Sequence, residues 1–304
     1  MAPRATDQFF PILLFGIIIG CRGKEGGRAD SARGSLPPVY PSAPANTNWN
    51  ANAGPIMIVP VGSGDSVAVV IPEATDSTIA SFQGINPPVS NLTFDLLGRG
   101  GKIGSSVAVS ALPPVQEKDC YSWPLARLQT ARANWQVGFA SGHVQAIKLD
   151  SIEVMSSADS AVLAASLARA AATLPIKADP TFRGLPFRVR SAYTFQLDSM
   201  QVVVADIVRS VNEEANPRLE HLLIIGERPA GTNGKFEVGY FSRTAGAEES
   251  IQATELLAAV AIGRTKQPVI VVNIEYDDGG KLGLIERTDS GQWRATWKSA
   301  YTDC

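Results

Sequence analysis

The chain has little of what most catalytic and metal-binding sites are made of: two histidines and three cysteines in 304 residues. The histidines, His143 and His221, stand far apart, which does not give the clustered spacing of a histidine-based zinc site. Net charge is also small, because 27 basic residues against 29 acidic ones leave −2 at pH 7. Without a strong basic field, a nucleic-acid partner is not expected.

The N-terminal region has no apolar run long enough to cross a membrane. Phe9–Gly20 carries no charge and follows Arg4. As a helix, these residues would span about 18 Å, well short of the ~30 Å hydrocarbon core. A short apolar run behind a basic residue is typical of the core of a signal peptide, so we expect residues 1–20 to be one.

The apolar run ends in Ile18-Ile19-Gly20-Cys21. This resembles the lipobox of bacterial lipoproteins, in which aliphatic and small residues precede an obligatory cysteine. The resemblance implies that the Cys21 thiol is diacylated and that cleavage makes Cys21 the new N-terminus, with a stable lipid anchor. Arg22 stands where an aspartate often retains such proteins at the inner membrane. We therefore expect anchoring in the bacterial cell envelope, at the outer membrane, and the alternatives are a signal without lipid or an uncleaved anchor.

Composition divides the remainder into a tether and a folded body. Residues 21–54 are rich in Gly, Ala, Pro, Ser and Asn, so they cannot bury enough apolar surface to offset their ordering entropy. As a flexible chain this segment would reach about 30 Å. Residues 55–114 show short apolar runs broken by Gly and Pro, with no helical period, which predicts a small β module.

The last part, residues 115–304, combines predicted strands with two predicted helices. Ser157–Leu174 has a serine cap and an apolar stripe at helical spacing. Glu248–Ile262 opens on acids and closes at Gly263. Further strands are predicted at Phe187–Leu197, Met200–Val211, Leu219–Glu227, Phe236–Ser242, Val269–Tyr276, Leu282–Arg287 and Trp293–Tyr301. Short turns make neighbouring strands antiparallel, so the predicted class is α+β, a largely antiparallel meander with two helices.

Two local pairings are also expected in this region. Trp135–Ala140 and Val144–Leu149 flank residues 141–143, a turn typical of a hairpin. Hairpins within residues 222–242 and 269–287 resemble each other, which suits an internal repeat. Two unrelated hairpins in one meander are the favoured alternative.

One motif resembles a catalytic block. Gly64-Asp65-Ser66-Val67 resembles the first block of GDSL-type hydrolases, in which the serine is the nucleophile. That family also carries an Asp-x-x-His pair near the C-terminus, whereas alanine and arginine stand three residues before the two histidines of this chain. A serine without its base is not activated, so the motif is interpreted as a turn.

Other candidate sites are also interpreted structurally. The polar residues 273–278 lack the glycine and the final glutamate of a calcium-binding EF-hand loop. Gly98–Gly104 lacks the spacing of a phosphate-binding loop and predicts a hairpin turn. We therefore predict no catalytic residue, no metal and no cofactor.

An aromatic set near the C-terminus is the one candidate binding surface. With strand period two, Trp293, Trp297 and Tyr301 would share one face, opposite Arg294 and Lys298. Exposed, such a face could stack on a sugar or anchor a partner. Buried, it is sheet core, which is the favoured interpretation.

The cysteine count predicts a disulfide bond. If Cys21 carries lipid, Cys120 and Cys304 remain, and thiols exported beyond the cytoplasm oxidise in pairs. The bond would hold Cys304, the last residue of the sequence, against fraying. Two free thiols are the alternative.

Two functions remain open from the sequence. The first is a non-enzymatic envelope lipoprotein whose body binds or scaffolds an envelope protein or a glycan. The second is a secreted hydrolase with dispersed carboxylates such as Glu275, Asp277 and Asp278, because dispersed acids leave no motif.

Overall fold

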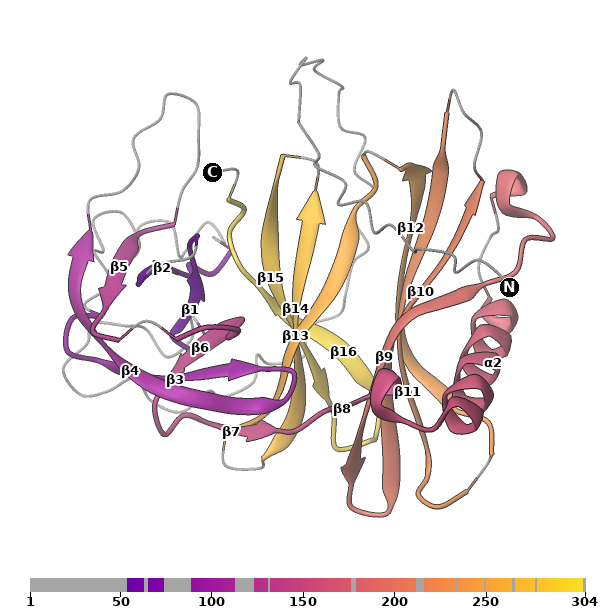
Figure 1. Cartoon of the computed structure of the whole chain (residues 1–304), viewed down its shortest axis with the longest axis horizontal. Coiled ribbons are helices and arrows are strands. Elements are labelled where there is room, and N and C mark those ends of the chain that lie inside the picture. Colours follow the sequence, from indigo (N-terminus) through magenta and orange to yellow (C-terminus); the bar gives the residue numbers. More distant parts are fainter. Residues whose placement is uncertain are drawn as a thin grey trace, which may run out of the picture. The chain divides into compact units, whose positions relative to one another are not determined.

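The computed structural model describes residues 54–62, 65–73, 89–112, 123–130, 132–175, 179–211, 216–232, 234–248, 250–263, 266–276 and 278–302. These residues form a barrel, two antiparallel sheets and one α-helix (Figure 1). The antiparallel α+β class predicted from the sequence is confirmed, with one α-helix in the described ranges where two were expected. None of the described helices is long and apolar enough to cross a membrane.

The barrel is a closed ring of six antiparallel strands in the order β1-β2-β5-β4-β3-β6. Its strands are β1 (Met57–Pro60), β2 (Ser66–Val69), β3 (Thr93–Gly98), β4 (Gly101–Leu112), β5 (Leu125–Leu128) and β6 (Val137–Ala140). Side chains such as Ile58, Phe94 and Leu96 form an apolar cluster of their own. The predicted small β module is confirmed, and it takes β5 and β6 from beyond the expected boundary at residue 114.

The second assembly, here named the outer sheet, has the order β12-β11-β10-β9-β8. Its strands are β8 (Asp150–Ser151), β9 (Arg188–Leu197), β10 (Met200–Val211), β11 (Arg218–Pro229) and β12 (Glu237–Ala247). The third assembly, the central sheet, has the order β16-β15-β14-β13-β7. Its strands are β7 (Val144–Ile147), β13 (Ala253–Ile262), β14 (Gln267–Tyr276), β15 (Gly279–Arg287) and β16 (Trp293–Lys298). Consecutive strands therefore pair as meanders, as the short turns predict.

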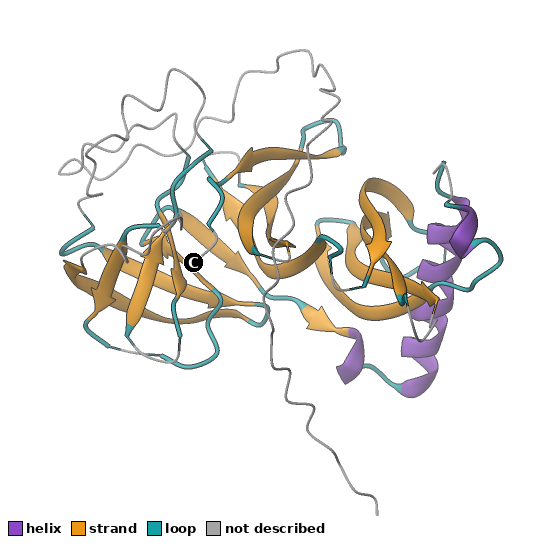
Figure 2. Ribbon diagram, turned by 90° about the horizontal axis from the view of Figure 1, so that it is seen from above, coloured by secondary structure: helices purple, strands orange, loops and turns teal. Residues whose placement is uncertain are grey.

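The two sheets pack face to face, and the central sheet is covered on both faces. One apolar cluster joins Val204 and Leu223 of the outer sheet to Ile270 of the central sheet. Another joins the opposite face of the central sheet, including Val271, to barrel residues such as Phe139. Figures 1 and 2 show the resulting order of barrel, central sheet, outer sheet and helix.

The helix α2 (Ser157–Thr173) covers the other face of the outer sheet. Ser156 caps its first turn, because the serine side chain accepts a hydrogen bond from the backbone N–H of Asp159. Leu163, Leu167 and Ala171 are the buried stripe, as the helical spacing predicts. The short 3-10 helices η2 (Ile152–Val154) and η3 (Pro180–Phe182) precede and follow α2 in the chain.

The predicted helix Glu248–Ile262 is wrong, because Ala253–Ile262 forms strand β13. Both faces of the central sheet are buried, so the sequence of this strand is a continuous apolar run without the usual alternation of apolar and polar residues. The run is rich in alanine, which has the highest helix propensity, and tertiary packing overrides that preference.

The predicted hairpin around residues 141–143 is also wrong. β6 closes the barrel against β1 and β3, whereas β7 pairs with β13 of the central sheet. The turn therefore leads the chain out of one assembly into another.

The structure repeats a larger unit than the two hairpins compared from the sequence. β9–β12 and β13–β16 are each a four-stranded antiparallel meander, and each gains one short edge strand, β8 or β7. The hairpins compared from the sequence, β11–β12 and β14–β15, occupy different places within their sheets.

Candidate functional site

A pocket of about 290 Å³ lies where the outer and central sheets meet the barrel. Its lining comes from β9, β10 and β11 on one side and from β13 and β14 on the other. The lining residues are Arg99, Glu153, Arg190, Ser191, Tyr193, Val204, Asp206, His221, Leu223, Ala253, Thr254, Glu255, Leu256 and Glu275. Sites at the junction of several structural units are common places for small ligands.

The barrel contributes one wall of the pocket through Arg99. This residue stands in the tight turn between β3 and β4, where Gly101 has a φ of +100° that favours glycine. Its Nε donates to the carbonyl of Leu256 at 2.8 Å, and its guanidinium pairs with Glu255 on β13. It also donates to the hydroxyl of Tyr193 at 3.3 Å and lies 5.4 Å from the centre of that ring. One side chain thus joins all three assemblies.

The inner wall of the pocket holds a histidine beside a carboxylate. His221 on β11 is only 2% exposed, and its Nε2 lies 2.8 Å from Oδ1 of Asp206 on β10. This Oδ1 is buried and forms no hydrogen bond within the described part of the chain. Arg190 on β9 pairs with the other oxygen of this carboxylate, with Nε 3.8 Å from Oδ2 of Asp206.

The rim and floor of the pocket differ in polarity. Glu153 and Glu275 are exposed at the rim, and Glu275 accepts a hydrogen bond from Nδ2 of Asn273 at 3.0 Å. Val204 and Leu223 are buried and supply apolar floor. The four carboxylates and two guanidinium groups of the lining leave a formal charge of −2, counted without His221.

The pocket does not assemble a known nucleophilic site. Ser191 and Thr254 line it, but no hydrogen bond joins either hydroxyl to His221 within the described structure. A Ser-His-Asp set needs the imidazole between the hydroxyl and the carboxylate. Among the described residues there is also no group of three or more His, Cys, Asp or Glu side chains able to hold a metal ion.

The predicted aromatic face does not form. Trp293 is buried between the two sheets, whereas Trp297 packs against the cluster on the barrel side. A β-bulge causes this, because the register of β15 with β16 shifts between Leu284 and Ile285, and one extra residue turns Trp297 to the opposite face. Tyr301 lies beyond β16, where its ring meets that of Tyr276 edge to face at 5.7 Å.

The buried Trp293 belongs to a polar contact between the sheets. Its indole Nε1 donates to Oε1 of Glu227 at 2.6 Å. Arg287 donates to both oxygens of the same carboxylate, from Nε at 2.6 Å and from Nη2 at 2.9 Å. Hydrogen bonding to Glu227 raises the pKa of Arg287 above its ordinary value. Through these contacts Glu227, Arg287 and Trp293 form a structural cross-link between the outer and central sheets.

The acids considered for a hydrolase do not converge. Glu275 lines the pocket, whereas Asp278 accepts a hydrogen bond from the hydroxyl of Tyr301. Asp277 lies outside the described residues, as do Cys21, Cys120 and Cys304.

The pocket residues Arg99, Asp206 and His221 were missed by the sequence analysis. A signal for the last two exists, because each is a polar residue among apolar neighbours in a strand, in VVVADIV and in EHLLII. Ionisable residues in buried strands are rare unless paired and often mark functional sites. No protein-family model, curated protein or solved structure matches the chain, so its function can be inferred only from its own residues.

Proposed function

We propose that the chain is a lipid-anchored protein of the bacterial cell envelope, and that its body binds a small polar ligand in the pocket between the two sheets. The observation that carries the binding role is the pocket itself. Charged side chains from three assemblies surround an apolar floor there, around the buried His221. A few placed polar groups over an apolar surface are typical of small-molecule sites.

The pairing and exposure of the four carboxylates in the pocket favour binding over catalysis. Glu255 is paired with Arg99, and Asp206 lies against His221. The remaining two, Glu153 and Glu275, are exposed. A carboxyl group that acts as a general acid near neutral pH usually stands in an apolar setting that keeps it protonated.

The anchoring role rests on the lipobox and on the tether. With Cys21 acylated, residues 22–54 would let the body sit about 30 Å from the membrane surface. The pocket would then be presented to molecules of the envelope space. Envelope proteins and glycans remain candidate partners of the rest of the body surface.

We expect Cys21→Ala to release the protein from membranes or to block its processing, because the substitution removes the acylated thiol. Membrane fractionation and metabolic labelling with palmitate measure this. Cys21→Ser is the matched variant, since it keeps the size and polarity of the side chain without the nucleophilic thiol. Unchanged membrane retention together with an unchanged protein mass would contradict the lipid anchor.

We expect protein isolated from membranes to carry a small ligand that Ala253→Trp excludes. Ala253 lines the pocket at the start of β13, and an indole there fills the space that the ligand needs. Native mass spectrometry would show a mass increment that disappears on denaturation. Ala161→Trp, at an exposed position of α2, is the control and should keep the increment. A protein without an increment, or an increment retained by Ala253→Trp, would refute the pocket as the binding site.

A hydrolase is the second candidate, because Glu153, Asp206 and Glu275 share one pocket. Two carboxylates across a pocket can act as general acid and as base or nucleophile. If this is the function, Asp206→Asn and Glu275→Gln should each abolish turnover of chromogenic glycosides that the parent protein cleaves. Absence of turnover by the parent protein leaves binding as the function.

A further inference from the structure

The charges around the pocket indicate which class of ligand it holds. We infer that the ligand is a small organic cation, an amine or guanidinium group attached to a short hydrocarbon part. This inference rests on the proposed binding function and specifies it further.

The first argument is the balance of free charge. Arg99 is fully engaged, since it bonds to the carbonyl of Leu256 and the hydroxyl of Tyr193 and pairs with Glu255. Arg190 is largely exposed and faces Asp206. An anion would have to compete with these carboxylates for each guanidinium, whereas a cation meets the net charge of −2. Electrostatic complementarity therefore selects against anions.

The second argument is the unsatisfied polar group in the inner wall. Oδ1 of Asp206 is buried in the pocket wall, and it forms no hydrogen bond with the described residues. A buried carboxylate oxygen without a hydrogen bond is costly, and a ligand that supplies one removes the cost. An ammonium or guanidinium N–H can donate to this carboxylate oxygen, which lies 2.8 Å from Nε2 of His221.

The third argument is that the pocket wall already accommodates an organic cation. The guanidinium of Arg99 lies 5.4 Å from the ring centre of Tyr193 and pairs with Glu255. An aromatic face beside a carboxylate is a favourable setting for a cation. The chain thus uses in its own wall the chemistry that we assign to the ligand.

The volume of the pocket and its apolar floor indicate the size and polarity of the rest of the ligand. A volume of about 290 Å³ is at the lower end for small-molecule pockets, so a few carbons beyond the charged group fit. Val204, Leu223 and Leu256 are buried apolar side chains that can cover a methylene chain.

Three probes of equal length and different charge test the inference. Pentane-1,5-diamine, glutarate and pentane-1,5-diol would each be titrated into the full-length protein by calorimetry. We expect saturable binding of the diamine that weakens as salt increases, and at least tenfold weaker binding of glutarate and the diol.

Substitutions locate the binding. Asp206→Asn should weaken diamine binding at least tenfold, and Glu275→Gln at the exposed rim should weaken it severalfold without disturbing the core. Asp65→Asn removes the charge of a half-exposed acid that pairs with Arg127 on the barrel, away from the pocket; it is the matched control and should leave binding unchanged. Thermal unfolding of each variant shows whether it is folded.

The outcomes separate this inference from the proposed function. If glutarate or the diol binds more tightly than the diamine and Ala253→Trp blocks that binding, the assignment of a cationic ligand is refuted. The proposed ligand-binding function of the pocket then stands. If none of the three probes binds, the assignment of a cationic ligand is also refuted. Native mass spectrometry then decides independently whether the pocket carries a ligand. Diamine binding that survives both Asp206→Asn and Glu275→Gln would place the cation elsewhere and refute the assignment.

Discussion

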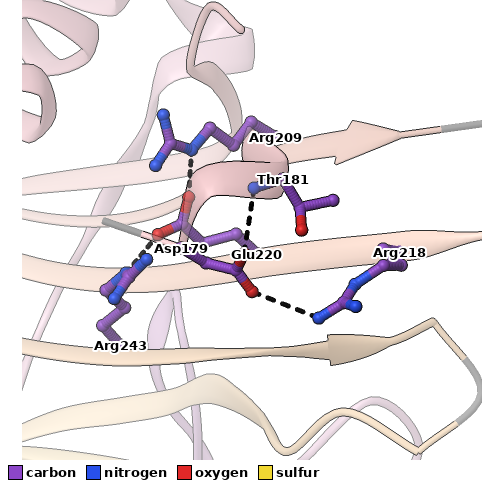
Figure 3. Close-up of polar contacts among 6 residues, drawn as sticks. All are labelled: Asp179, Thr181, Arg209, Arg218, Glu220 and Arg243. Atoms are coloured by element: carbon purple, nitrogen blue, oxygen red, sulfur yellow. Dashed lines mark hydrogen bonds and ion pairs between the residues drawn. The ribbon is translucent and has the colours of Figure 1, made fainter. Parts of the chain in front are cut away.

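Replacement of Glu220 by alanine is expected to destabilise the protein by about 3–5 kcal/mol, because it removes one partner of a buried ion network. Glu220 on β11 is 1% exposed, and its two oxygens pair with Arg209 and Arg243 from the neighbouring strands. Arg209 is buried as well, with its guanidinium 5.7 Å from the ring centre of Phe182 and 4.4 Å from that of Phe187. Figure 3 shows the carboxylate between the two arginines.

A separate set of polar contacts beside this network holds the segment that follows the helix. Asp179, the cap of η3, accepts from the backbone of Thr181 and pairs with Arg218 at 3.1 Å (Figure 3). The backbone hydrogen bond of Thr181 contributes most to keeping the pKa of Asp179 below its ordinary value. Loss of Glu220 would leave Arg209 and Arg243 without their shared carboxylate.

Thermal unfolding measures the Glu220 effect, which corresponds to a Tm decrease of about 10 °C for a body of this size. Glu237→Ala, an exposed acid on β12, is the control and should change stability by less than about 0.5 kcal/mol. Replacing Glu220, Arg209 and Arg243 together by apolar residues should cost less than Glu220→Ala alone. A Tm change for Glu220→Ala as small as that of the control would show that the network does not support the fold.

The strands of the outer sheet were predictable because local chemistry and tertiary packing agree there. Met200–Val211 is predicted and found with the same bounds, after a turn in which Asp198 has a φ of +49° that aspartate tolerates. The central sheet was harder, since burial on both faces removes the alternation that distinguishes a strand. Strand β13 was therefore mistaken for a helix.

The pocket could not be predicted from local pattern, because its members come from distant parts of the chain. Arg99 in a barrel turn contacts Glu255, which is 156 residues further along the chain, and no sequence spacing predicts that contact. Asp206 and His221 come together through the pairing of β10 with β11. The polarity of these two residues within apolar strands was readable, but their meeting depends on register and on the facing sheet.

The disulfide between Cys120 and Cys304 remains a prediction, because both cysteines lie outside the described residues. Pro124 and Ala300 are both anchored on the same short stretch of chain. The N–H of Val69 donates to the carbonyl of Pro124 at 2.7 Å, and the N–H of Ala300 donates to the carbonyl of Ile71 at 2.7 Å. Each cysteine stands four residues along the chain from one of these two described residues.

If the bond forms, its removal by Cys120→Ser with Cys304→Ser is expected to cost about 2–5 kcal/mol, because the bond would close a loop of about 185 residues in the unfolded chain. Reducing agent should lower the Tm of the parent protein by a similar amount and leave that of the double variant unchanged. Peptide mapping without reduction should recover the two cysteines in one linked species. Two thiols that titrate in the unfolded, unreduced protein would show that the cysteines are free and that the stabilisation has another source.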